Sequence, residues 1–139
     1  MTEPDGSEEQ QSTGSTVSGG AGPAFVVSVA DGITHIKPTR KPTTSEILAF
    51  AVDLITSGSH PRRLWDYSDM NFPFSIEELK LLADGAVRLN ESPCRIATLV
   101  SDDLGYGSMR VFAAHFTTEQ APMMVFRDGD AALRWLKQD

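Results

Sequence analysis

The residues with the clearest chemical potential are hydroxyls and carboxylates that stand where strands end and helices begin. Ser75 follows the loop "DMNFPF" and opens "SIEELKLL", so its hydroxyl could cap a helix or accept a phosphoryl group. Ser75 and Glu78 have the Ser-x-x-Glu spacing of a capping box, and a capping serine stabilises a helix by about 1 kcal/mol. A phosphate on Ser75 would meet Glu77 and Glu78, whose charges oppose its attraction to the helix dipole. We expect Ser75 to be a helix cap. Phosphorylation of Ser75 is the alternative, and Ser68 at the strand end is a weaker second candidate for a phosphoacceptor.

Three aspartates could in principle hold a divalent cation at the strand ends. Asp102 and Asp103 follow one predicted strand and Asp69 follows another, and carboxylate oxygens are ligands for such ions. A solvated loop and a helix cap explain the same residues more simply, and we expect a loop from Asp102 to Tyr106. The "GYG" at 105 to 107 lacks the later glycine of a dinucleotide-binding loop and is expected to be a turn. We predict neither a metal nor a cofactor.

The cysteine and the histidines do not form a catalytic pattern. Cys94 is expected to be a small buried residue, because no histidine lies near it in sequence to form a nucleophile pair. His35, His60 and His115 are scattered and lack the spacing of metal ligands. No Gly-x-Ser-x-Gly, Walker-type or Cys-x-x-Cys motif occurs. We therefore expect a protein that is not an enzyme.

The segment "WDYSDMNFPF" (65 to 74) concentrates apolar side chains at the end of a predicted strand, where open α/β folds place their binding sites. Its loop residues Met70, Phe72 and Phe74 allow three interpretations. They could fold back over the core, form an exposed surface for a protein partner, or line a groove for an apolar ligand.

Composition bounds the domain and its partners. The chain has 139 residues and a formal charge of −7. Residues 1–23 contribute −4 of this charge (Glu3, Asp5, Glu8 and Glu9) and contain almost no bulky aliphatic residue, which predicts a disordered acidic tail before a domain at 24–139. The domain then carries about −3, which argues against nucleic acid as a partner. Only a local basic patch could reverse this, and "KPTRK" (37 to 41) with Arg62 and Arg63 is the one candidate. A single cysteine and the absence of an apolar run of about 18 residues predict a cytoplasmic protein without a membrane span.

Hydrophobic periodicity and turn residues predict an α/β domain. Asp31-Gly32 between two β-rich runs predicts a hairpin over 24–38, and Thr43 with Glu46 predicts a capping box at the first helix. After the hairpin, strands and helices alternate, which implies a mostly parallel sheet in the order ββαβαβαβα. The predicted elements after the hairpin are helix 43–58, strand 62–68, helix 75–89, strand 94–101, helix 106–116, strand 123–127 and helix 128–138.

The C-terminal motifs resemble those of a known family. Tyr106-Gly107-x-x-Arg110 is followed by Phe126-Arg127-Asp128 and then by Ala132-x-x-Trp135-Leu136. With the order of elements, these residues resemble the SpoIIAA-like (STAS/CRAL-TRIO-like) family of small bacterial proteins over about residues 24–137. The resemblance implies a STAS-type domain. In the anti-sigma-factor antagonists with this fold, a phosphoacceptor serine at the second helix start follows an aspartate and precedes a glycine. That serine falls at Ser75, which here follows Phe74 and precedes Ile76.

The resemblance implies a non-enzymatic regulatory domain that binds an unidentified protein partner, and homodimerisation is also open. The alternative is a carrier or sensor of a small apolar, lipid-like ligand, because the fold is shared with CRAL-TRIO lipid-binding domains. An apolar cavity lined by Met70, Phe72, Phe74 and Phe112 would favour the carrier, and an exposed flat surface would favour the protein partner. The expected contact surface comprises Asp69, Met70, Phe72, Phe74, Ser75, Asp102, Asp103 and Tyr106.

Overall fold

The structure is a computed structural model that describes residues 23–58, 60–86, 93–119 and 121–138. The predicted tail therefore lies outside the described residues except for Pro23, and so do residues 87–89 of the second predicted helix. The elements are β2 (Phe25–Ala30), β3 (Ile33–Pro38), α1 (Thr44–Ser57), β4 (Arg62–Asp66), α2 (Ile76–Ala86), β5 (Arg95–Leu99), α3 (Asp103–Phe116), β6 (Met123–Phe126) and α4 (Gly129–Leu136).

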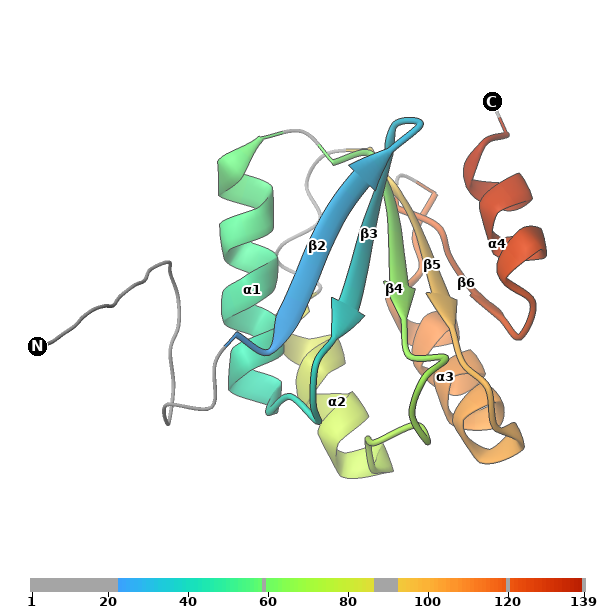
Figure 1. Ribbon diagram of the computed structural model, residues 1–139. Coiled ribbons are helices and arrows are strands. Elements are labelled where there is room, and N and C mark those ends of the chain that lie inside the picture. Colours follow the sequence, from blue (N-terminus) through green and yellow to red (C-terminus); the bar gives the residue numbers. More distant parts are fainter. Residues whose placement is uncertain (1–22, 59, 87–92, 120, 139) are drawn as a thin grey trace, which may run out of the picture.

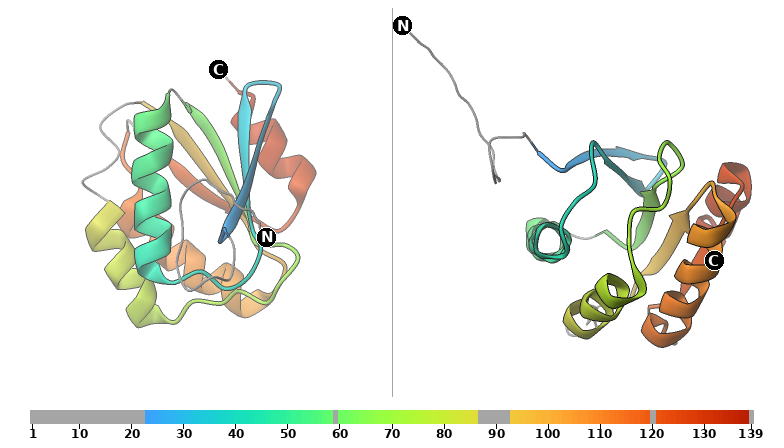
Figure 2. Two further views of the ribbon diagram at one scale, coloured as in Figure 1. Left: turned by 60° about the vertical axis from the view of Figure 1, so that its left-hand side comes forward. Right: turned by 90° about the horizontal axis from the view of Figure 1, so that it is seen from below.

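The predicted order of elements is confirmed. The five strands lie side by side in chain order, with β2 antiparallel to β3 and all other neighbours parallel. Because each right-handed crossover advances the sheet in the same direction, α1, α2 and α3 cover one face. α4 follows the last strand and covers β4, β5 and β6 from the other face (Figures 1 and 2). None of the helices in the described ranges is long and apolar enough to cross a membrane.

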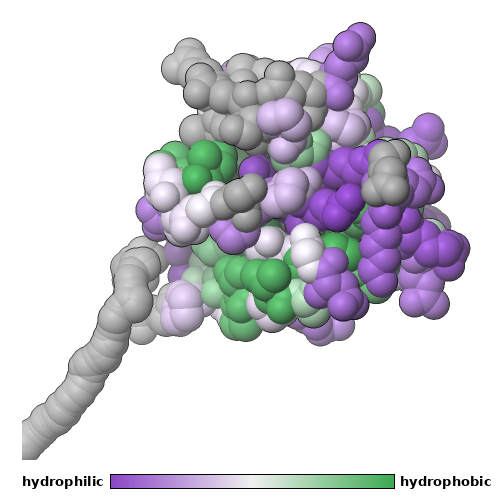
Figure 3. Space-filling model, turned by 90° about the horizontal axis from the view of Figure 1, so that it is seen from above, coloured by the Kyte–Doolittle hydropathy of each residue, from purple (hydrophilic) through white to green (hydrophobic). Residues whose placement is uncertain are grey.

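The predicted hairpin turn is also confirmed. Asp31 and Gly32 both have left-handed backbone angles, with φ of 54° and 76°. This pair of angles is typical of a type I′ turn, whose twist matches that of the strands it joins. Figure 3 looks onto this end of the molecule and shows a hydrophobic area on the side of the hairpin, where β2 forms an edge of the sheet.

The first helix begins with the predicted capping box. The backbone N–H of Glu46 donates to Thr43 Oγ1 (3.1 Å), and the backbone N–H of Thr43 donates to Glu46 Oε1 (2.9 Å). Gly58 ends the helix with φ of 153°, an angle that favours glycine. α4 begins, as predicted, with Asp128 as its cap.

Two predicted boundaries are wrong for physical reasons. α3 begins at Asp103 rather than at residue 106, so the predicted loop up to Tyr106 is instead the first helical turn, whereas the helix cap predicted for these aspartates is confirmed at Asp102. Gly105 hid this start, because glycine lowers helix propensity. A Cβ at Gly105 would lie 2.3 Å from Phe72 Cβ, so packing requires glycine there. β4 ends at Asp66, because its carboxylate accepts the backbone N–H of Ser68 (2.9 Å) and turns the chain.

Two cores lie on the two faces of the sheet. The larger core is under α1, α2 and α3, and the smaller core joins α4 to β4 and β5. β5 is buried on both faces, as its continuous apolar sequence predicted.

Candidate functional site

The aromatic loop after β4 folds back over the larger core. Phe74 is buried, and Met70 and Phe72 are half-buried against the core. The rings of Tyr67, Phe72 and Phe74 meet edge to face in all three pairs, with centroids 5.8, 5.7 and 5.3 Å apart. Phe74 is therefore not accessible to a partner, and the loop does not present the exposed aromatic surface that one interpretation required.

Asp102 holds this loop against α3. Its Oδ1 accepts the backbone N–H of Phe72 (3.0 Å), and its Oδ2 accepts the backbone N–H of Gly105 (3.1 Å). The hydrogen bond from Phe72 is the main reason that the pKa of Asp102 lies below its usual range. Asp102 is thus both the cap of α3 and the residue that closes the loop.

The other predicted polar residues do not converge. Asp69 pairs with Lys37, and Asp103 pairs with Arg127, whose guanidinium lies 6.0 Å from the Tyr106 ring centroid. Within the described ranges, no group of three or more His, Cys, Asp or Glu residues is placed to hold a metal ion. The three aspartates have separate structural partners.

Ser75 caps α2 as predicted. The backbone N–H of Glu78 donates to Ser75 Oγ (3.1 Å), and the backbone N–H of Ser75 donates to Glu78 Oε1 (2.9 Å). The hydrogen bond from Ser75 lowers the pKa of the Glu78 carboxyl. Both members of the capping box are therefore occupied in forming the helix start.

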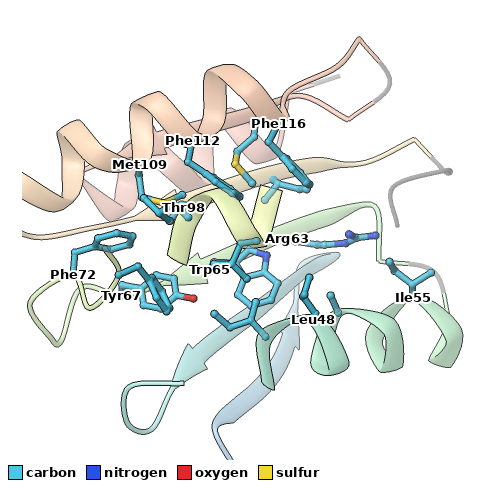
Figure 4. Close-up of a pocket in the computed structure, with 17 residues that line it drawn as sticks. Leu48, Ile55, Arg63, Trp65, Tyr67, Phe72, Thr98, Met109, Phe112 and Phe116 are labelled. Carbon is cyan, nitrogen blue, oxygen red and sulfur yellow. The ribbon is translucent and has the colours of Figure 1, made fainter. Parts of the chain in front are cut away.

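An apolar cavity of about 90 Å³ lies between the sheet and α1, α2 and α3 (Figure 4). Phe72, Phe74 and Phe112 line it, as one interpretation of the sequence expected, but Met70 does not. Side chains from α1 and α3 form opposite walls, and the sheet forms the floor. The lining residues are Ile47, Leu48, Ala51, Ile55, Arg63, Trp65, Tyr67, Phe72, Phe74, Leu79, Leu82, Ile96, Thr98, Met109, Phe112, Phe116 and Met123.

Two hydroxyls in this cavity have no partner among the described residues. Tyr67 and Thr98 are only 5% and 2% exposed, and neither hydroxyl makes a hydrogen bond to another described residue. The Tyr67 hydroxyl points along the cavity (Figure 4), and burial raises the pKa of Tyr67. Neither is among the fully enclosed side-chain oxygens that lack a partner in the described residues, so each opens onto the cavity. The sequence interpretation missed Thr98, although a lone hydroxyl in the apolar run "RIATL" was a usable signal.

Arg63 places a cation at the far end of the cavity from Tyr67 (Figure 4). Its Nε donates to the backbone carbonyl of His60 (2.7 Å). Cys94 is buried as predicted, and burial raises the pKa of its thiol against the smaller opposing effect of the Arg63 charge. From the sequence, Arg63 was assigned to a basic patch with residues 37–41 and not to a cavity.

A separate polar cluster lies on the opposite face of the sheet. His35 Nε2 is 2.8 Å from Asp66 Oδ2, while the hydroxyl of Ser68 donates to Asp66 Oδ1 (2.5 Å). Burial alone would raise the pKa of Asp66, but the hydrogen bonds from Ser68 and His35 outweigh it and lower the pKa. Ser68, the second phosphoacceptor candidate, thus has its hydroxyl engaged by Asp66.

Comparison with known proteins gives no relative from which a role could be transferred: no protein-family model, curated protein or solved structure significantly matches the chain.

Proposed function

We propose that the protein is a non-enzymatic sensor or carrier of a small, mainly apolar molecule that binds in the cavity under α1, α2 and α3. The observation that carries the proposal is the pair of unpartnered hydroxyls, Tyr67 and Thr98, inside otherwise apolar walls. A ligand with one oxygen atom would satisfy these hydroxyls while its carbon skeleton fills the remaining space.

The size of the cavity limits the ligand. An apolar cavity of about 150 Å³ can hold benzene, whereas this one measures about 90 Å³. A short-chain ketone or alcohol matches this volume. A long acyl chain exceeds it, so the ligand is smaller than the lipid-like molecule expected from the sequence.

The STAS-type fold and membership of the SpoIIAA-like family are part of the same proposal. The order ββαβαβαβα supports it. The C-terminal motif residues also support it, because Asp128 caps α4 and because Ala132 and Leu136 are fully buried on the side of α4 that faces the sheet. A cytoplasmic location is proposed on the single cysteine, which is typical of proteins in a reducing compartment.

A regulatory domain that binds a protein partner is the second candidate. It is favoured by Leu104 and Ile76, which are 79% and 45% exposed on the first turns of α3 and α2. If this surface binds the partner, Leu104→Glu abolishes co-purification of a polypeptide from the host and leaves ligand binding in the cavity unchanged. Co-purification that survives Leu104→Glu contradicts this candidate.

The ligand proposal is tested with Trp65, which lines the cavity, whereas Trp135 lies on the other face of the sheet. In a Trp135→Phe background, Trp65 fluorescence is titrated with acetone and with its hydrocarbon isostere 2-methylpropene. We expect saturable changes with the ketone. Tyr67→Phe should weaken ketone binding about two- to tenfold, the equivalent of one hydrogen bond, and leave hydrocarbon binding unchanged.

Ala51→Leu is the matched control, because Ala51 lines the cavity and a leucine there occupies the same space. It should abolish binding of both probes without unfolding the protein. The proposal is overturned if neither probe binds, or if Ala51→Leu binds both as the native chain does.

A further inference from the structure

The outer edge of β2 lacks the features that usually protect a free strand. Within the described part of the chain, β2 has a strand neighbour on one side only. Its sequence "FVVSVA" contains no charge and no proline, and Val26, Val27 and Val29 are 56%, 41% and 63% exposed. Natural edge strands are normally blunted by lysine, proline, a bulge or covering chain, because unpaired backbone groups recruit another strand.

The backbone groups that face outward can be identified from the hairpin. The N–H of Thr39 donates to the carbonyl of Ala24 (2.9 Å), and hydrogen-bonded positions alternate along an antiparallel pair. Every second residue from Ala24 therefore bonds to β3, and the residues between them, Phe25, Val27 and Val29, direct their N–H and C=O groups outward. Pro38, which has no N–H, stands opposite Phe25 and agrees with this assignment.

We propose that β2 pairs antiparallel with β2 of a second copy, with Val27 on the two-fold axis. In this register Val27 faces the partner's Val27, and Phe25 faces the partner's Val29. All three outward-facing residues then exchange hydrogen bonds with their counterparts. The two sheets join into one continuous sheet across an isologous interface.

Self-complementarity selects a second copy as the occupant. The strand is apolar along its whole length and therefore matches itself. Antiparallel pairing also brings the exposed Asp31 of each copy to the Pro23 end of the partner's β2, where the Thr39 hydroxyl donates to the Pro23 carbonyl. Residues 1–22, which precede β2 in the chain, contain Val17 as their one bulky aliphatic residue after Met1, a composition that does not match an apolar strand.

Cysteine cross-linking tests the register. In Val27→Cys the two thiols lie across the axis at a Cα separation of about 5.5 Å, which a disulfide can span. In the control Val29→Cys the two copies of residue 29 are about 13 Å apart along the strand, beyond its reach. We expect mild oxidation to cross-link the first variant alone. Cross-linking of the second variant, or of neither, overturns the proposal.

Sedimentation velocity of the full chain tests the assembly itself. The native chain should be a dimer, and Val27→Pro should be a monomer, because proline removes an outward N–H and leaves the β2–β3 ladder intact. Val27→Lys is a second variant with the same expected result, and circular dichroism verifies that both remain folded. A monomeric native chain overturns the proposal. If the native chain is a monomer and becomes a dimer when residues 2–22 are deleted, the proposal is also overturned, because the segment before β2 then occupies the edge.

Discussion

The two faces of the sheet are covered by different means. On the face under α1, α2 and α3, large side chains such as Trp65, Tyr67 and Phe112 meet and leave a cavity of about 90 Å³ between them. On the other face, α4 lies against the sheet through small residues, with Ala132 on the helix and Ala97 on β5 both fully buried.

The difference follows from the shapes that have to be matched. An alanine on each surface lets one helix approach the sheet closely, and larger side chains around this contact, among them Leu64, Leu136 and Trp135, fill the smaller core. Three helices in a row have spaces between them that aromatic rings fill only in part, and a cavity remains. The face that is less completely filled is therefore the one on which we propose that a ligand binds, while the other face contributes stability.

The largest expected effect is on the α4 face. Leu136→Ala should lower the free energy of unfolding by about 2–5 kcal/mol, because Leu136 is fully buried and its removal creates a new cavity. Leu48→Ala should cost less, because Leu48 is half-buried beside existing space. Urea denaturation of both variants measures the difference. Equal losses would show that the two faces are packed alike.

Two substitutions of alanine by leucine should change the free energy of unfolding in opposite directions. Ala97→Leu overpacks the α4 face and should lower the free energy of unfolding by about 3 kcal/mol or more. Ala51→Leu fills the cavity and should raise that free energy by about 0.5–2 kcal/mol. Thermal unfolding would settle the signs, and destabilisation by Ala51→Leu would mean that the cavity cannot admit three carbon atoms.

The two glycines of α3 differ in how closely they pack, and only Gly105 contacts Phe72 in the loop that lines the cavity. Gly105→Ala should cost about 1–2 kcal/mol, because its Cβ would lie 2.3 Å from Phe72 Cβ. Gly107→Ala meets no atom within 4 Å and should stabilise the helix by up to about 1 kcal/mol. Chemical denaturation of the pair gives the comparison, and similar effects would argue against close packing of Phe72 on α3.

A smaller effect is expected at the start of α2. Ser75→Ala removes the capping hydroxyl and should cost about 1 kcal/mol, whereas Ser75→Asp retains a capping oxygen and should differ from the native chain by only a few tenths of a kcal/mol. Equilibrium unfolding measures both. A strongly destabilised aspartate variant would indicate that Glu77 and Glu78 repel an added charge more than capping offsets.

The smallest expected effect is in acid and arises on the α4 face. Asp66 has a pKa below the ordinary value of 3.8, so its carboxylate contributes stability above that pH and loses the contribution as the pH falls through the folded-state pKa. Asp66→Asn should therefore be less stable than the native chain at neutral pH, by a margin that narrows below about pH 4. Unfolding curves measured across this pH range test the trend. If the difference in free energy of unfolding does not change with pH, ionisation of Asp66 does not cause it.

Much of the fold could be predicted because local signals and tertiary structure agree. Asp31-Gly32, the Thr43 and Ser75 capping boxes and the apolar run of β5 each specify an element that is present. A helix cap was expected at Asp102, but the helical turn after it was missed, since Gly105 is explained only by contact with Phe72, which is distant in sequence.

The candidate site was predicted less well for the same reason. Phe72, Phe74 and Phe112 were named with Met70 as the lining of a cavity in one of three interpretations, and Met70 does not line it. Thr98 and Arg63 were not, because nothing local distinguishes a strand residue that faces a cavity from one that faces a filled core. That distinction depends on how α1, α2 and α3 pack together.

The strand order has a consequence for synthesis on the ribosome. Because β2 to β6 are neighbours in the same order as they occur in the chain, each emerging strand can add to the sheet already formed. The surface that α4 covers stays exposed until α4, the last of these elements, has left the exit tunnel. A chain stalled after β6 would present this apolar surface to chaperones. Whether chaperones bind the nascent chain there therefore depends on one eight-residue helix, α4.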